Sequence, residues 1–184
     1  MVPEAPLEST DNGRVAKGDG WFVLDARDGR WYSREGRPAL CDLEGDTQFP
    51  QLGINIQVLW PGEPMAMYHW EADQEDFLVV SGEGLLIIEG QERPLKAWDF
   101  VHCPPETRHS FVGAGDAPCV LLCAGSRQWQ KDGPWGSYCV DETAARYNAS
   151  SPEETHDGEV AYARFPPGRA TGYPAGLLAG DEPD

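Results

Sequence analysis

Short runs of apolar and aromatic residues, separated by glycine and proline, recur along the chain at intervals of roughly 8–12 residues. Val, Ile, Leu, Phe, Tyr and Trp dominate these runs, a choice typical of strands in an all-β sandwich or barrel. Strands are expected at 21–25, 30–33, 54–60, 64–71, 76–80, 84–90, 97–103, 109–113 and 119–124. The pattern therefore predicts an all-β barrel of about 8–11 strands.

Apolar and more polar residues alternate along segment 54–60, and this alternation distinguishes its two faces. One face carries Ile54, Ile56, Val58 and Trp60, and the other carries Asn55, Gln57 and Leu59. Successive side chains of a strand point to opposite sides, so one face packs while the more polar face meets a cavity or solvent. Hairpin turns are expected at 81–84 and 90–92, where glycines separate two apolar runs.

Helix-forming patterns occur only late in the chain. They are expected at 141–147 and at 151–154, where Ser151, Pro152 and Glu154 have the spacing of a capping box. Three regions follow: an N-terminal arm at 1–20, a barrel at 21–125, and a partly helical extension at 126–184. The acidic, Pro- and Gly-rich ends, 1–20 and 166–184, are expected to run over the surface or to be disordered.

The net charge and the cysteine content indicate which partners are excluded and which compartment is expected. The 184 residues carry a formal charge of −17, which repels nucleic-acid phosphates and anionic membranes. No stretch approaches 18 continuous apolar residues, and the first twenty residues lack the pattern of a secretory signal. Five cysteines form no C-x-x-C pair and are expected to be reduced and structural. We expect a cytoplasmic protein that binds neither nucleic acid nor membranes.

Four residues are candidates for a metal site. His69 and Glu71 are two apart on a strand and share a face. Glu75 faces the same cavity if the short connection after Glu71 is a turn between neighbouring antiparallel strands. His109 follows a proline turn and begins another strand. Two imidazoles and one or two carboxylates that converge inside a barrel are a ligand set for a divalent first-row metal with open positions.

The spacing of these residues resembles the two motifs of the cupin superfamily. The first motif is matched at His69, Glu71, Glu75 and Gly82, and the second at Asp99, Pro104 and His109. The resemblance covers residues 54–124. The sequence departs from the motifs where Glu71 replaces the second histidine, Glu106 replaces a glycine, Gly113 stands where an asparagine is common, and Gly62 comes one residue early.

The resemblance implies a small, single-domain, RmlC-like jelly-roll barrel, a fold that often dimerises, with a metal held inside by histidines and a glutamate. It does not imply one reaction, because cupins include dioxygenases, isomerases, decarboxylases, metal-free binding proteins and storage proteins. A homodimer is also expected from the aromatic residues of the N-terminal region: Trp21, Phe22, Trp31 and Tyr32.

Other residues are weaker candidates for a role in the site. His102 is expected to be a buried, hydrogen-bonded histidine and is only a secondary candidate for the pocket. Met65 and Met67 are expected to line the cavity, whereas Tyr68 alternates out of phase with His69. The tryptophans Trp60, Trp70 and Trp98 are expected to be structural.

The leading hypothesis is a cupin that binds Fe(II), Mn, Ni or Zn through His69, Glu75 and His109 and acts on a small organic molecule, as an oxygenase or isomerase does. Glu71 is either a fourth ligand, an acceptor for an imidazole N–H, or an acid or base beside the metal. The alternative is a noncatalytic small-ligand binding or sensor module whose metal is structural or absent. A storage or structural protein is a third reading.

Overall fold

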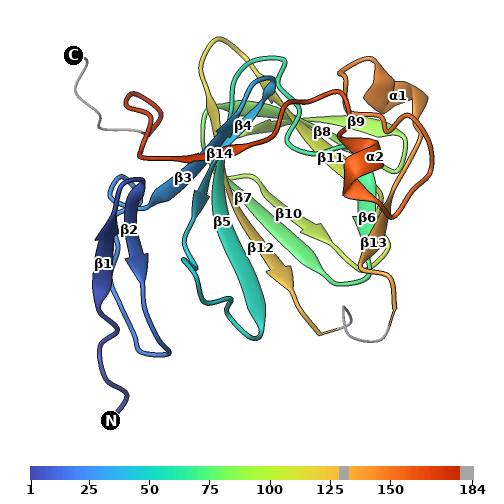
Figure 1. Ribbon diagram of the computed structural model, residues 1–184. Helices are drawn as coiled ribbons and strands as arrows, with labels where there is room; N and C mark the ends of the chain where they lie inside the picture. The colour runs from blue at the N-terminus through green and yellow to red at the C-terminus, as the bar shows by residue number, and fades with distance from the viewer. Residues whose placement is uncertain (129–132, 179–184) are drawn as a thin grey trace.

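The computed structural model describes residues 1–128 and 133–178, which form fourteen β-strands and two short α-helices (Figure 1). The strands are β1 (Leu7–Thr10), β2 (Gly13–Ala16), β3 (Arg30–Arg34), β4 (Arg37–Asp42), β5 (Leu52–Leu59), β6 (His69–Glu71), β7 (Glu75–Ser81), β8 (Glu83–Ile88), β9 (Gln91–Lys96), β10 (Phe100–Cys103), β11 (His109–Ala114), β12 (Cys119–Ser126), β13 (Gly136–Tyr138) and β14 (Arg169–Thr171). The helices are α1 (Glu142–Ala145) and α2 (Gly158–Ala161).

Two antiparallel sheets make up the body of the protein. The seven-stranded sheet has the order β10-β7-β12-β5-β4-β3-β14, and the five-stranded sheet has the order β13-β6-β11-β8-β9. Figure 1 shows β5, β12, β7 and β10 fanning out on one side and α1 and α2 lying beside the strands of the other sheet. The all-β jelly-roll fold predicted from the sequence is confirmed, as two facing sheets of the described residues rather than one continuously bonded barrel.

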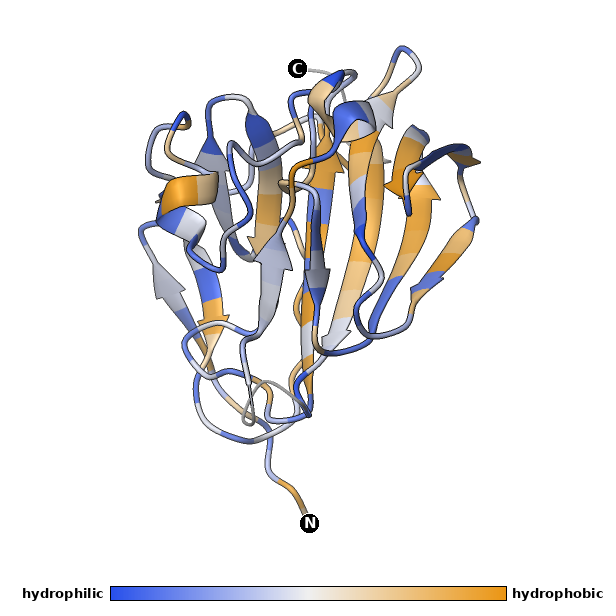
Figure 2. Cartoon of the chain, turned by 90° about the vertical axis from the view of Figure 1, so that its right-hand side faces the viewer, coloured by the Kyte–Doolittle hydropathy of each residue, from blue (hydrophilic) through white to orange (hydrophobic). Residues whose placement is uncertain are grey.

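The core lies between the two sheets. Phe77 on β7 and Leu121 on β12 project from the larger sheet and pack with Leu86 on β8 and Phe111 on β11 of the smaller one. The rings of Phe77 and Phe111 are 4.6 Å apart at their centroids. Hydrophobic colouring is concentrated in the strands in Figure 2, as expected when alternate residues of each strand face a shared interior.

The C-terminal extension covers the outer faces of both sheets. Ala144 of α1 packs with Ile87 and Val112 on the outside of the five-stranded sheet. Leu177 packs with the fully buried Trp31 on the outside of the seven-stranded sheet. Through β13 and β14 the extension also adds an edge strand to each sheet, so it is built into the body of the protein. Residues 179–184 of the expected tail lie outside the described part.

Several expected elements differ in the structure. Segment 21–25 is not a strand, because only Trp21 pairs, through an isolated bridge with Glu4. Segment 64–71 forms a strand only from His69 onward. No helix forms at 151–154, since the Ser151 hydroxyl donates to the Glu153 carbonyl and Thr155 bridges to Tyr138 instead. The second helix, α2, begins later.

The N-terminal residues expected to run as an arm contain the β1–β2 hairpin. Strand β9 was not among the expected strands. It contains Pro94, which is tolerated because β9 is the edge of its sheet. Within residues 1–128 and 133–178, no helix is both long and apolar enough to cross a membrane.

Candidate metal centre

Three side chains from both sheets meet at one point inside the molecule. His69 begins β6 and His109 begins β11, and these neighbouring antiparallel strands pair the two histidines directly. Glu75 begins β7, which belongs to the opposite sheet. The expected turn between neighbouring strands is therefore wrong: the connection after Glu71 crosses from one sheet to the other, and Glu75 faces the histidines across the interior.

The distances within this cluster are short. One ligand atom each from His69, Glu75 and His109 lies within 4.8 Å of the other two. The His109 Nε2 atom is 3.4 Å from Glu75 Oε2, and the centroids of the two imidazole rings are 4.9 Å apart. Both histidines are buried, and His109 is fully inaccessible. The three side chains could together hold one ion.

The orientation of the two imidazoles suits metal binding. The Nδ1 atom of His69 lies 2.7 Å from the Met67 carbonyl oxygen, and that of His109 lies 3.0 Å from the Thr107 carbonyl oxygen. In each case Nδ1–H donates to the carbonyl two residues earlier, which leaves the Nε2 lone pair free. The buried His109 Nε2 has no hydrogen-bond partner in the described part of the chain. A metal ion would satisfy it, and backbone carbonyls that fix the tautomer are typical of metal-bound histidines.

Burial shifts the protonation of the cluster. Loss of solvation, together with the nearby His109, lowers the pKa of His69 to about 3. Burial also lowers the pKa of His109. Desolvation, with the neighbouring Glu71 charge, raises the pKa of Glu75 to about 9. Neutral imidazoles are the form that binds metals, and a dication would favour the ionised carboxylate.

Glu71 lies beside this cluster, outside the group of three. Its Oε1 atom is 3.8 Å from His69 Nε2, so the two side chains share a face of β6 as predicted. Desolvation, and then the charge of Asp73, raise the pKa of Glu71 to about 7. A carboxyl group with this pKa exchanges a proton readily near neutral pH.

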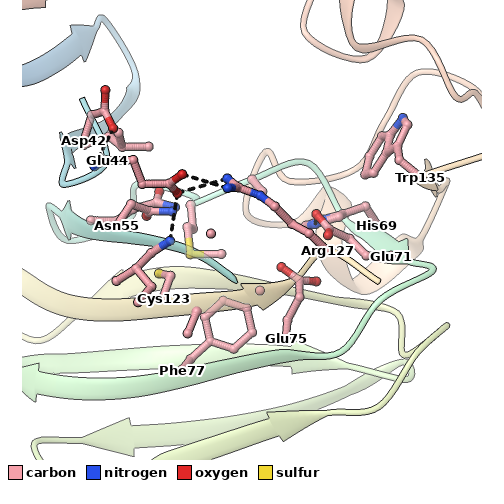
Figure 3. Close-up of a pocket in the computed structure, with 18 of the residues that line it drawn as sticks. Asp42, Glu44, Asn55, His69, Glu71, Glu75, Phe77, Cys123, Arg127 and Trp135 are labelled. Atoms are coloured by element: carbon pink, nitrogen blue, oxygen red, sulfur yellow. Dashed lines mark hydrogen bonds and ion pairs between the residues drawn. The ribbon is translucent and has the colours of Figure 1, made fainter. Parts of the chain in front are cut away.

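A cavity of about 510 Å³ opens next to the cluster and is lined by His69, Glu71 and Glu75 (Figure 3). Asn55 and Gln57, which form the polar face of β5, also line it. The sequence left open whether this face meets a cavity or solvent, and in the structure it meets the cavity. In Figure 3 the Glu75 carboxylate points toward the region between Arg127 and His69. The cavity is large enough for a small organic molecule.

Sequence reasoning missed other residues that line this cavity: Tyr32, Arg37, Arg127, Trp135, Tyr138 and Tyr162. Trp135 and Tyr138 form an aromatic wall beside His69, with ring centroids 6.2 Å and 5.9 Å from it. No motif marks these residues. The only available signal was the number of aromatic residues in the chain, which does not say where they lie.

The secondary candidates fall elsewhere. His102 is not buried: it projects from the outer face of β10, and its Nδ1 atom lies 2.7 Å from Asp76 Oδ1. Met65 lines the cavity as expected, whereas Met67 is fully buried and contacts Arg164. The Tyr68 hydroxyl accepts a hydrogen bond from the Gly90 amide.

Comparison with known proteins agrees with the fold. Residues 55–125 match the family model of the cupin domain. An uncharacterized protein of Methanocaldococcus jannaschii is 24% identical over 62 residues, which are 34% of this chain and 50% of that protein. The match thus spans about half the length of this curated relative.

Two solved structures share the fold. An RmlC-like cupin from Shewanella frigidimarina has a TM-score of 0.51 and 18% identity, covering 61% of this chain and 96% of that one. A predicted oxalate decarboxylase from Thermotoga maritima has a TM-score of 0.51 and 17% identity, covering 58% and 100%. Together with the family-model match, they show that residues 55–125 form a cupin domain and that the chain shares the cupin fold.

Proposed function

We propose that this protein is a mononuclear metal-dependent cupin that binds a small organic molecule in its central cavity and transforms it. The observation that carries the proposal is the meeting of His69, Glu75 and His109, with ligand atoms within 4.8 Å of one another and the Nδ1 atoms of both histidines already engaged. Two imidazoles and one carboxylate suit Fe(II), Mn, Ni or Zn and leave coordination positions open.

The bound ion and the residues around it would each have a different role. A bound divalent ion would supply Lewis-acid chemistry by polarising an oxygen of the bound molecule, as an isomerase requires, and Fe(II) would also supply the redox chemistry of an oxygenase. Glu71 lines the cavity beside His69 and would accept or return a proton of the bound molecule. Trp135 and Tyr138 form an apolar wall that excludes water from that end of the cavity.

Glutamine substitutions separate these two roles. Glu75→Gln is expected to weaken metal binding at least tenfold, since a neutral amide oxygen is a poorer ligand and no longer compensates the charge of the dication. Glu71→Gln is expected to keep metal affinity within about threefold of wild type, because its carboxylate lies outside the cluster of three. Titration of both metal-free variants with Mn²⁺ and Zn²⁺, followed by calorimetry, measures this. Equal losses in the two variants would instead make Glu71 a ligand.

A noncatalytic binding or sensor module is the alternative outcome. Such a protein would hold its metal through four protein ligands, with no exchangeable water. Water-proton relaxation on the Mn²⁺-loaded protein distinguishes the two, because an open position gives inner-sphere water and a closed shell does not. A closed shell would overturn the proposal of an enzyme while leaving the metal site in place.

The homodimer remains a prediction, but the surface expected to form the interface differs from the one expected from the sequence. Trp31 is fully buried within one chain. The exposed apolar side chains Val80, Trp98 and Phe100 instead lie at the outer face of β7 and β10, where Val80 and Phe100 alternate with the buried Val79 and Val101. An apolar patch of this kind is uncommon on a monomer, and a second copy of the chain would cover it.

We therefore expect light scattering to give the mass of a dimer at micromolar concentration. The double variant Trp98→Ser and Phe100→Ser is expected to give a monomer, because both side chains would leave the interface. Trp21→Ser removes an exposed tryptophan of the surface first expected from the sequence, and this variant is expected to remain a dimer. A monomeric wild type across the same concentrations would contradict the prediction.

We also propose a cytoplasmic location. The support is that the five cysteines, Cys41, Cys103, Cys119, Cys123 and Cys139, are all unpaired and buried, as expected in a reducing compartment.

A further inference from the structure

Arg37 is a cation without a carboxylate partner at the cavity. It begins β4 and lines the same cavity as His69, Glu71 and Glu75. Its Nη2 atom donates to the Met65 carbonyl, but its buried Nη1 atom has no hydrogen-bond partner among the residues that the structure describes. No carboxylate of the described chain forms an ion pair with it, and Glu63 acts on it only through its charge, without an ion pair. A buried donor left unpaired costs free energy, so a ligand that supplies an acceptor here would be stabilised.

The guanidinium is held in place by aromatic rings. Its Cζ atom lies 4.7 Å from the ring centroid of Tyr162 and 5.3 Å from that of Phe165. The Tyr162 hydroxyl in turn accepts a hydrogen bond from the Met67 amide, two residues before His69. Stacking of this kind fixes the plane of the guanidinium and therefore lowers the entropic cost of binding a planar anion.

The second arginine of the cavity, Arg127, differs from Arg37 because it has a carboxylate partner. Arg127 donates from Nη1 to Glu44 Oε2 at 2.7 Å and from Nη2 to Glu44 Oε1 at 3.0 Å (Figure 3). Its charge is thus already balanced by a carboxylate. Of the other acidic side chains at the cavity, Glu71 and Glu75 lie at the metal cluster and Asp42 pairs with Arg30. Of the two arginines that line the cavity, Arg37 is consequently the one without an ion-paired carboxylate.

We propose that Arg37 binds the carboxylate of a small organic monocarboxylate, whose other polar group reaches the metal cluster. This inference rests on the proposed function, because it names the class of molecule that the metal site would act on. A carboxylate is preferred over a phosphate group because a single unbalanced guanidinium matches one negative charge. Its planar fork also suits two carboxylate oxygens.

Ligand binding to the wild-type protein gives the first test. The probes are straight-chain monocarboxylates from acetate to hexanoate, the uncharged amide of each, and inorganic sulfate and phosphate. Ligand-observed NMR measures their dissociation constants, with and without added Zn²⁺. At least one carboxylate is expected to bind ten times more tightly than its amide and than either inorganic anion. Equal affinity of acid and amide, or tighter binding of phosphate or sulfate, would overturn the proposal.

Variants then locate the anion site. Arg37→Met is expected to weaken the best carboxylate at least tenfold and to leave its amide unchanged. Arg37→Lys should give an intermediate loss, since it keeps the charge but not the fork. The control, Arg93→Met, removes an exposed arginine of the edge strand β9 and should bind as wild type does. Carboxylate binding that does not change in Arg37→Met and Arg37→Lys would refute the assignment.

Metal content separates this proposal from the proposed function. Elemental analysis of Arg37→Met after Zn²⁺ loading is expected to match wild type, because Arg37 is not in the ligand cluster. If wild type holds metal but no carboxylate is preferred, the anion site is wrong and the metal site stands. If carboxylates bind through Arg37 but no metal is held, the proposed function is wrong and the anion site stands.

Discussion

Replacing His109 with alanine is expected to reduce metal affinity by more than 100-fold. Loss of a hydrogen bond that only orients a ligand costs about 10–100-fold in metal affinity, and His109→Ala removes a ligand atom itself. The Nε2 atom of His109 is buried, lies 3.4 Å from Glu75 Oε2 and has no hydrogen-bond partner in the described residues. His69→Ala should behave in the same way.

The measurement is elemental analysis of each variant after loading with Zn²⁺ and desalting. His102→Ala is the matched control, because it removes an exposed imidazole that bonds to Asp76 on the outer face of β10. Circular dichroism and thermal unfolding show whether each variant has kept its fold. A folded His109→Ala variant that retains the wild-type metal content would contradict the assignment of the ligand set.

Replacing Arg127 with methionine is expected to lower the free energy of unfolding by about 3 kcal/mol, the lower end of the range for breaking a buried ion pair. Glu44 is 8% exposed and also accepts hydrogen bonds from the Phe49 and Ile54 amides. The substitution leaves its charge buried without a cation. The pair joins the segment before β5 to the end of β12, so the loss falls on the fold itself.

Urea unfolding measures the change. The double variant Glu44→Gln and Arg127→Met should recover part of the lost stability, because the unpaired charge is gone and only a neutral amide remains to be solvated. Arg93→Met, at an exposed site, should change stability by less than about 0.5 kcal/mol. A loss below about 1 kcal/mol for Arg127→Met would show that the pair behaves as a surface salt bridge.

The sequence predicted those features that depend on local periodicity. The alternation of Asn55 and Gln57 with apolar neighbours assigned the polar face of β5, which lines the cavity. The two-residue spacing of His69 and Glu71 placed both on one face of a strand. Parity also placed Glu75 on the face of β7 that carries Phe77 and Val79, which the core confirms. These relations hold within single strands and need no knowledge of the fold.

Features that depend on contacts between distant segments were not predictable in this way. The crossing from β6 to β7 between sheets looks like a hairpin turn in the sequence, because a connection of three residues can serve either purpose. Tyr138 and Tyr162 reach the cavity only because the C-terminal extension returns to it. The capping-box pattern at Ser151 failed because pairing of Thr155 with Tyr138 competes with helix formation.

Tertiary packing also decided the surroundings of single side chains. His102 was expected in the interior, yet it alternates with the buried Val101 and Cys103 and so faces outward. Trp31 was expected at a dimer surface and is instead covered by the C-terminal Leu177. Nothing in the residues near Arg37 indicates that it lacks an acidic partner, because that depends on which side chains the fold brings to the cavity.

We expect His69, Glu75 and His109 to hold one metal ion. Crystals of untagged protein reconstituted with Mn²⁺ or Zn²⁺, with anomalous diffraction measured at the absorption edge of the metal, test it most directly. We predict one anomalous peak per chain, with the Nε2 atoms of both histidines and a Glu75 oxygen within bonding distance and at least one position left open. No peak between these side chains after reconstitution with iron(II), manganese, nickel and zinc would contradict it.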